Sequence, residues 1–162
     1  MKRLLIIWHS TTGGTRQMAA AAAEGAGDQD AEVVTMPAAD AGADDLIAAD
    51  GYLFATPETL AAIAGVMKAF FDRAYYPALG RIEGRPYATL ICAGSDGANA
   101  ARQVARIATG WRLKPVAEPL IICTQAQTPE AILAAKTIAA PDLARCRELG
   151  AALAAGLALG VF

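Results

Sequence analysis

The chain begins with a continuous apolar run, Leu4 to Trp8, which a polar segment ends abruptly. Such a run is typical of a strand that is buried on both faces of a parallel sheet. The segment Ser10 to Thr15 follows with four hydroxyl side chains and two glycines. Ala-rich residues from Thr15 to Glu24 then favour a helix, which Gly25 ends. The chain therefore opens as a strand, a hydroxyl-rich loop and a helix.

This alternation continues through the rest of the chain. We expect strands at Glu32–Met36, Gly51–Ala55, Pro86–Ala93 and Pro115–Cys123, and helices at Ala43–Ala49, Leu60–Tyr76, Asn99–Thr109 and Pro141–Gly160. Alternating strands and helices indicate parallel βαβ units with right-handed crossovers. The sequence thus predicts an α/β fold, a three-layer αβα sandwich whose five-stranded parallel sheet has the order 2-1-3-4-5.

Composition limits the class of protein. The 162 residues suit one domain over residues 1–162, and 55% hydrophobic content excludes a disordered chain. The net charge of -2 argues against a nucleic-acid partner, and the longest apolar runs are too short for a membrane span. Cys92, Cys123 and Cys146 are odd in number and widely spaced, so we expect reduced thiols, a cytoplasmic protein and no metal site.

The loop Ser10 to Thr15 is the strongest candidate for a binding site. It lies before a helix N-terminus, where free backbone N–H groups and the helix dipole favour an anion such as a phosphate monoester. The alternative is that these residues only cap the helix. One residue is enough for a cap, so four hydroxyls with paired glycines exceed that need.

Two further loops leave the same edge of the predicted sheet. They are Thr56 to Thr59, after the third strand, and Gly94 to Gly97, after the fourth. Ligands of open α/β sheets bind outside the carboxyl ends of the strands, where strand order reverses. Judged alone, however, each loop is equally compatible with a plain turn or a helix cap.

These loops resemble those of a known family. Ser10-x-Thr12-Gly13-x-Thr15 matches the phosphate loop of the flavodoxin-like FMN proteins, Ser/Thr-x-Thr-Gly-x-Thr. Phe54 to Thr59 and Met67 to Arg73 are similar to the loop and helix of the NAD(P)H-dependent flavin oxidoreductase branch. Cys92 to Gly97 resembles the third flavin loop of that branch. The resemblance covers most of the chain and implies a flavodoxin-like fold with FMN as cofactor.

The resemblance also implies which residues hold FMN. The expected set comprises the phosphate loop and the two walls around the isoalloxazine ring: Ser10, Thr11, Thr12, Gly13, Gly14, Thr15, Thr56, Pro57, Glu58, Thr59, Gly94, Ser95, Asp96 and Gly97. No residue is expected to act as a catalytic acid or base, since hydride transfer needs positioning more than proton transfer. His9 could add positive charge near the phosphate, although a structural role is the more common one.

Two functions remain open at this point. Electron-carrier flavodoxins characteristically flank the ring with Trp or Tyr and are strongly acidic, whereas neither ring loop here contains an aromatic residue. We therefore expect an oxidoreductase that takes hydride from NAD(P)H and passes it to a quinone-type or other small acceptor. The alternative is a non-catalytic flavodoxin that carries electrons between protein partners, with Tyr75, Tyr76 or Trp111 folded over the ring. The Ala-rich, weakly charged helices could pack in a homodimer, although burial against the sheet of the same chain explains them equally well.

Overall fold

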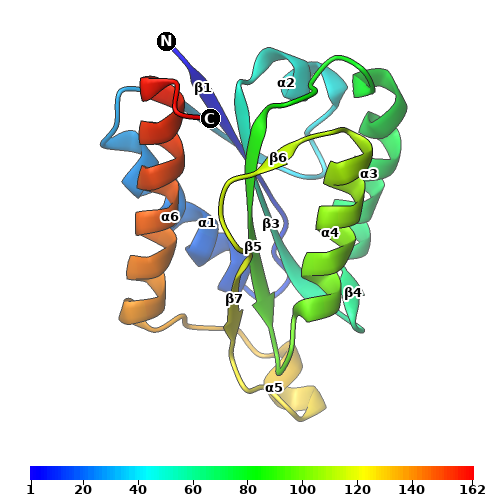
Figure 1. Cartoon of the computed structure of the whole chain (residues 1–162). Helices are drawn as coiled ribbons and strands as arrows, with labels where there is room; N and C mark the ends of the chain where they lie inside the picture. The colour runs from blue at the N-terminus through cyan, green and yellow to red at the C-terminus, as the bar shows by residue number, and fades with distance from the viewer.

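The computed structural model describes residues 1–162 as an alternating α/β chain (Figure 1). Its elements are β1 (Arg3–Trp8), α1 (Gly14–Gly27), β2 (Glu32–Pro37), α2 (Ala43–Ala48), β3 (Gly51–Thr59), β4 (Ala62–Ile63), α3 (Gly65–Ala78), β5 (Pro86–Ala93), α4 (Ala98–Gly110), β6 (Lys114–Pro115), β7 (Leu120–Cys123), α5 (Pro129–Leu133) and α6 (Ala140–Leu159). No helix is long and apolar enough to cross a bilayer.

The sheet confirms the predicted topology. Its strand order is β2-β1-β3-β5-β6, β7 also pairs with β5, and all of these pairs are parallel. With β6 and β7 counted as the fifth strand, the order is the predicted 2-1-3-4-5. Only the two-residue β4 runs antiparallel, beside the end of β3.

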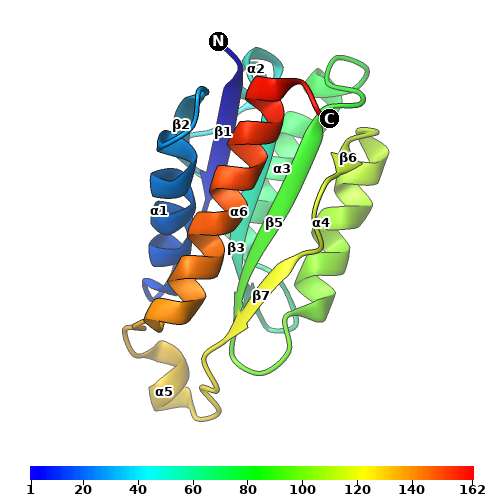
Figure 2. The same cartoon turned by 60° about the vertical axis from the view of Figure 1, so that its left-hand side comes forward.

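Helices cover both faces of the sheet, and the two faces have different cores. α1 and α6 lie on one face, and α3 and α4 lie on the other (Figure 2). The core on the α3 and α4 face contains 24 buried residues and holds Phe54, Phe71 and Trp111 among other aromatic side chains. The core on the α1 and α6 face contains 18 buried residues, many of them alanines. We call these two regions the aromatic face and the alanine face.

The alanine face is built by close approach of two helix backbones. A Cβ at Gly150 of α6 would collide with the backbone oxygen of Ala22 in α1. A Cβ at Gly25 of α1 would collide in the same way with the oxygen of Arg147 in α6. Small side chains on both helices are therefore a condition of this packing.

The predicted helix from Leu60 to Tyr76 is wrong at its start. β3 does not stop at Ala55 but continues to Thr59, turns, and pairs with β4 at Ala62. The helix α3 begins only at Gly65. Leu60 and Ala61 form the tip of this hairpin with φ angles of 50° and 61°, a left-handed conformation that costs non-glycine residues about 1–2 kcal/mol each.

Two other boundaries also differ from the prediction. The expected strand Pro115 to Cys123 is split into β6 and β7, because the four residues 116–119 lie opposite only two residues of β5, and the register of pairing shifts there. The short helix α5 was not predicted. Thr128 caps it by accepting a hydrogen bond from the N–H of Ala131, and Pro129 occupies its first turn.

Candidate cofactor site

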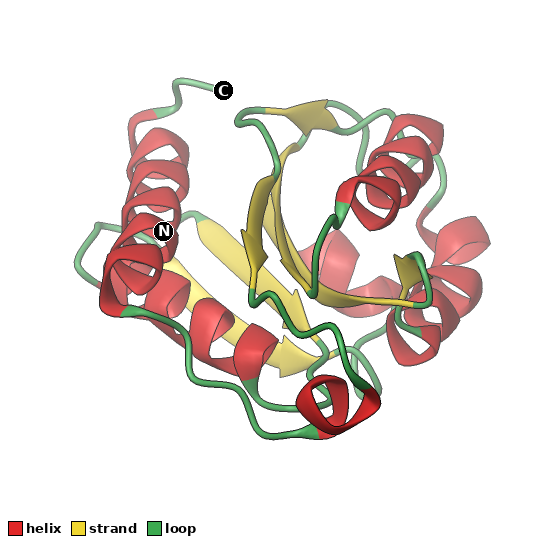
Figure 3. Cartoon of the chain, turned by 90° about the horizontal axis from the view of Figure 1, so that it is seen from below, coloured by secondary structure: helices red, strands yellow, loops and turns green.

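The loops that leave the carboxyl ends of β1, β3, β5 and β7 enclose a pocket of about 420 Å³. This volume lies in the usual range for small-molecule and cofactor sites. Figure 3 looks onto this edge of the sheet, with α5 nearest to the viewer. The pocket is lined by Ser10, Thr11, Thr12, Gly14, Thr15, Pro57, Glu58, Thr59, Leu60, Ala61, Cys92, Ala93, Gly94, Ser95, Thr124, Ala126, Gln127, Ile132, Leu133 and Lys136.

The N-terminus of α1 presents free donors to this pocket. Ser10 Oγ accepts a hydrogen bond from the N–H of Gly13 at 3.1 Å, which closes the loop on itself. Gly13 has a φ of 94°, and this left-handed turn leads into the helix. The N–H groups of Gly14, Thr15 and Arg16 have no acceptor within the chain. They are therefore available to an anion, which the helix dipole also attracts.

Thr15 is the strongest sign that this loop holds a ligand. Its side chain is 1% exposed, and its Oγ1 is buried without a hydrogen-bond partner. The thiol of Cys92 lies close by, but sulfur is only a weak donor and acceptor. A buried hydroxyl that lacks a partner is costly, and a bound phosphate oxygen would satisfy it. The loop therefore fits the phosphate of FMN.

Gly14 keeps this loop close to the sheet. A Cβ at Gly14 would lie 2.7 Å from Cys92 Sγ and 3.4 Å from a methyl group of Ile138. Burial raises the pKa of the Cys92 thiol, so this group is a neutral packing neighbour of the loop. A larger residue at position 14 would push the free N–H groups away from the pocket.

The second predicted loop forms one wall of the pocket. Pro57 and Thr59 line it, whereas Thr56 is fully buried behind them, where its hydroxyl donates to the oxygen of Pro57 at 3.0 Å. Leu60, at the strained hairpin tip, is 97% exposed at the rim.

The third predicted loop forms the opposite wall. Gly94 and Ser95 line the pocket, and a Cβ at Gly94 would come within 2.9 Å of the oxygen of Ala126. Asp96 turns away and accepts a hydrogen bond from the N–H of Ala98 at 3.2 Å, at the start of α4. Gly97 has a φ of 82° and leads into that helix.

The structure brings the three predicted loops together at one edge of the sheet. Gly13, Thr56, Asp96 and Gly97 are not among the lining residues, whereas the other predicted residues are. Which of these residues contact FMN stays a prediction. Glu58 belongs to the lining, but its carboxylate binds the N-terminus of α4, where it accepts from the N–H groups of Gly97 and Ala100.

A fourth wall was missed by the sequence analysis. It consists of Thr124, Ala126 and Gln127 after β7, together with Ile132, Leu133 and Lys136 in and after α5. Ile132 and Leu133 are 50% and 75% exposed. The loop after the fifth strand could have been placed here by the same rule that placed the others, and Thr128-Pro129 is a recognisable start of a helix.

Lys136 and Gln17 fasten this fourth wall to the phosphate loop. The N–H of Lys136 donates to the oxygen of Thr12 at 2.9 Å, and its ammonium donates to three carbonyl oxygens of Ala131, Ile132 and Ala134. The amide of Gln17 donates to the oxygens of Gly13 and Lys136 and accepts from the N–H of Ile138. The phosphate loop and the segment around Lys136 therefore form one hydrogen-bonded unit.

The aromatic residues considered as ring covers lie elsewhere. Trp111 is fully buried in the aromatic face, where its indole donates to the oxygen of Tyr75 and its ring stacks on that side chain. Tyr76 packs edge-on against Tyr75 and is absent from the pocket lining. None of the three side chains lines the pocket in which the ring would bind.

His9 adds no charge to the phosphate loop, and Cys92 and Cys123 are free thiols. Burial lowers the pKa of His9, which favours the neutral ring at pH 7 and gives no positive charge to the phosphate loop. Cys92 packs into the alanine face, whereas Cys123 packs against the aromatic face. The two thiols are free, and the sheet lies between them.

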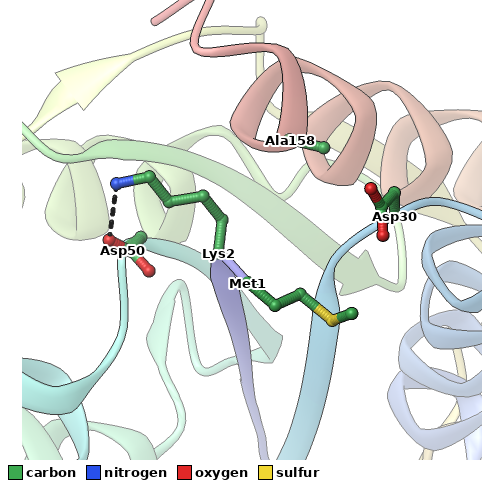
Figure 4. Close-up of a pocket in the computed structure, with 5 residues that line it drawn as sticks. All are labelled: Met1, Lys2, Asp30, Asp50 and Ala158. Atoms are coloured by element: carbon green, nitrogen blue, oxygen red, sulfur yellow. Dashed lines mark hydrogen bonds and ion pairs between the residues drawn. The ribbon is translucent and has the colours of Figure 1, made fainter.

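A second hollow, of about 630 Å³, lies at the opposite edge of the sheet and is lined by Met1, Lys2, Asp30, Asp50 and Ala158 (Figure 4). The charged groups in it are largely committed to one another. Lys2 Nζ donates to one oxygen of Asp50 at 3.0 Å, and the N–H of Arg3 donates to the other at 2.8 Å. This hollow has no free helix N-terminus and no buried polar atom that lacks a partner.

The fold, with its loops gathered at this edge of the sheet, is that of a flavodoxin-like protein. More closely, the chain belongs to the family of the NADPH-dependent FMN reductases, whose model matches residues 27–128. This span includes the walls after β3 and β5 but not the phosphate loop, so the assignment of that loop depends on its motif and geometry.

Individual relatives are similar to parts or all of the chain. A flavodoxin of Aquifex aeolicus is 32% identical over 97 residues, which cover 59% of this chain and 50% of that protein. The match thus spans half the length of this curated relative. A flavodoxin from the domain Archaea superposes with a TM-score of 0.80 at 19% identity, covering 96% of this chain and 99% of its own. A WrbA-like flavodoxin from Agrobacterium tumefaciens superposes with a TM-score of 0.75 at 20% identity, with 98% and 99% covered. These two structural likenesses show the fold alone.

Proposed function

We propose that the chain is an FMN-dependent oxidoreductase that takes hydride from NAD(P)H and passes it to a quinone-type or other small acceptor. The observation that carries the proposal is the phosphate loop, where free N–H groups and the unpaired hydroxyl of Thr15 face one pocket. Bound FMN would supply the redox chemistry, since its ring accepts and returns hydride. The family match supports the same cofactor.

The anion sites of the pocket favour a mononucleotide. Two helices of eight residues or more begin at the pocket, α1 and α4. The N-terminus of α1 is free, whereas the carboxylate of Glu58 already occupies that of α4. One free site suits a ligand with one phosphate group, such as FMN, better than a dinucleotide with its pyrophosphate.

The walls of the pocket favour direct access to the ring. The lining contains no Phe, Tyr or Trp, so no aromatic side chain covers the space between Pro57 and Gly94. A nicotinamide ring could stack there and align its hydride with the flavin, because orientation supplies most of what this reaction needs from a protein. The residues of the chain bind and orient the reactants, and none is assigned as an acid or base.

Flavin binding and reduction test the proposal. The purified protein is titrated with FMN, its visible absorption is recorded, and NADH or NADPH is then added without oxygen. We expect bound flavin that bleaches with one of the two nucleotides and is reoxidised by a quinone over many turnovers. Absence of FMN binding would refute the argument from the phosphate loop.

The second candidate is an electron carrier between proteins. The similarity to the flavodoxin of Aquifex aeolicus favours it. A carrier would bind FMN equally well, but it would bleach only with a reductase or dithionite and would show a stable semiquinone. Steady-state oxidation of NAD(P)H with a quinone therefore separates the two functions. The homodimer and the cytoplasmic location stay predictions, which sedimentation and cell fractionation would test.

A further inference from the structure

Glu58 lies between two walls of the pocket. It stands in the part of β3 that lines the cavity, next to Pro57, and its side chain crosses to the start of α4. One carboxylate oxygen accepts from the N–H of Gly97 at 3.0 Å, and the other accepts from the N–H of Ala100 at 3.4 Å. Both oxygens are therefore used by the backbone that follows β5.

The partial charge at the start of α4 helps to hold the side chain of Glu58 in place. The N-terminus of α4 carries partial positive charge, and a carboxylate that accepts two backbone N–H groups there is stabilised by both effects. Gly97 packs closely against β7, since a Cβ there would lie 2.6 Å from a methyl group of Ile121. The wall after β5 is thus held from both sides.

Other contacts position the rest of the hairpin on the same helix. The amide of Asn99 donates to the oxygen of Ala61, and the N–H of Ile63 donates to the side chain of Gln103 at 2.9 Å. These contacts hold the tip and the return strand of the hairpin. The contact of Glu58 joins the wall at Pro57 to Thr59 directly to Gly97, at the end of the wall after β5.

We infer that Glu58 is a positioning residue for the flavin ring, whose carboxylate fixes the separation between the wall at Pro57 to Thr59 and the wall at Gly94 to Gly97. This inference rests on the proposed FMN site and adds to it a role that the phosphate loop cannot supply. Glu58 acts through the two loops and does not itself contact the reacting atoms.

The substitution Glu58→Gln tests this role. Gln keeps the shape of the side chain but has one acceptor oxygen, so only one of the two N–H groups keeps its partner. We expect the dissociation constants of FMN and of riboflavin to rise by the same factor, about tenfold, because the ring walls loosen while the phosphate loop is unchanged. The visible circular dichroism of the bound flavin should change as well.

Asp45→Asn is the matched control. Asp45 also places a carboxylate at a helix N-terminus, where it accepts from the N–H of Gly42 at 2.8 Å. It belongs to α2, at the end of the molecule opposite to α5 (Figure 1). We expect this variant to lower the melting temperature about as much as Glu58→Gln does, with unchanged flavin affinity and dichroism.

The outcomes separate the inference from the proposed function. If the unaltered protein binds flavin and Glu58→Gln binds both flavins as tightly with the same dichroism, Glu58 is only a helix cap and the inference falls alone. A loss confined to FMN would place the effect in the phosphate loop and would also overturn it. If the unaltered protein binds neither flavin, the proposed function and the inference fall together.

Discussion

The two faces of the sheet are packed by opposite means. On the aromatic face, large rings such as Phe54, Phe71 and Trp111 fill the space between the sheet and its helices. On the alanine face, α1 and α6 approach so closely that Gly25 and Gly150 have no room for a Cβ. Aromatic rings therefore fill one face, whereas on the other face two helix backbones are in direct contact.

The helices of the two faces also support different parts of the candidate site. α1 carries the phosphate loop at its N-terminus and is held from behind by α6. α4 carries the wall that Glu58 braces. The close packing of α1 and α6 thus positions the predicted anion site, and the aromatic packing positions the predicted ring site.

The largest expected effect is on the aromatic face. Trp111→Ala removes a fully buried ring and leaves the oxygen of Tyr75 without its indole donor. We expect a loss of about 3–5 kcal/mol in the free energy of unfolding, measured by urea denaturation. A loss below about 1 kcal/mol would mean that this face can collapse around the cavity and does not depend on volume.

The next-largest effect is expected on the alanine face. There a Gly→Ala substitution should change the free energy of unfolding in the direction opposite to that seen in most helices. Gly→Ala within a helix normally stabilises by about 0.5–1 kcal/mol. At Gly150 we expect instead a destabilisation of about 1–3 kcal/mol, because the new Cβ meets the backbone of α1. Gly27→Ala is the control, since nothing lies within 4 Å of a Cβ there. If Gly150→Ala were as stable as the control, the two helices could move apart freely.

The smallest effect is a truncation on the alanine face. Cys146 is fully buried, and burial raises the pKa of its thiol to about 11, so it is protonated at neutral pH. We expect Cys146→Ala to cost only about 1 kcal/mol by urea denaturation, because little volume is removed. The native thiol should also react with a disulfide reagent far more slowly than the partly exposed Cys123. A cost as large as that of Trp111→Ala would remove the distinction between the faces.

The order of the strands was predictable from the sequence because each buried strand is an uninterrupted apolar run between turn residues. The start of α3 was not. Leu60, Ile63 and Met67 have helical spacing, yet Leu60 faces solvent and Ile63 belongs to β4. The hairpin is held by side chains of α4, Asn99 and Gln103, and such contacts leave no trace in the local period of apolar residues.

The candidate site was likewise predictable from the sequence only in part. The loops after β1, β3 and β5 were predictable, because the carboxyl ends of parallel strands meet at one edge. The direction of Glu58 and the attachment of Lys136 to the phosphate loop were not, since both depend on partners distant in the chain, Gly97 and Thr12. Motifs locate the loops, whereas tertiary hydrogen bonds determine which side chains remain free for a ligand.

The contact between Gln17 and Lys136 has a consequence for biosynthesis. The two residues are 119 positions apart, so the phosphate loop leaves the ribosome long before the segment that fastens it. A nascent chain that ends within α4 has β1, α1 and the loop motif but lacks both this partner and α6. The pocket can therefore be completed only after the segment around Lys136 has been synthesised, because contacts this distant in sequence are slow to form.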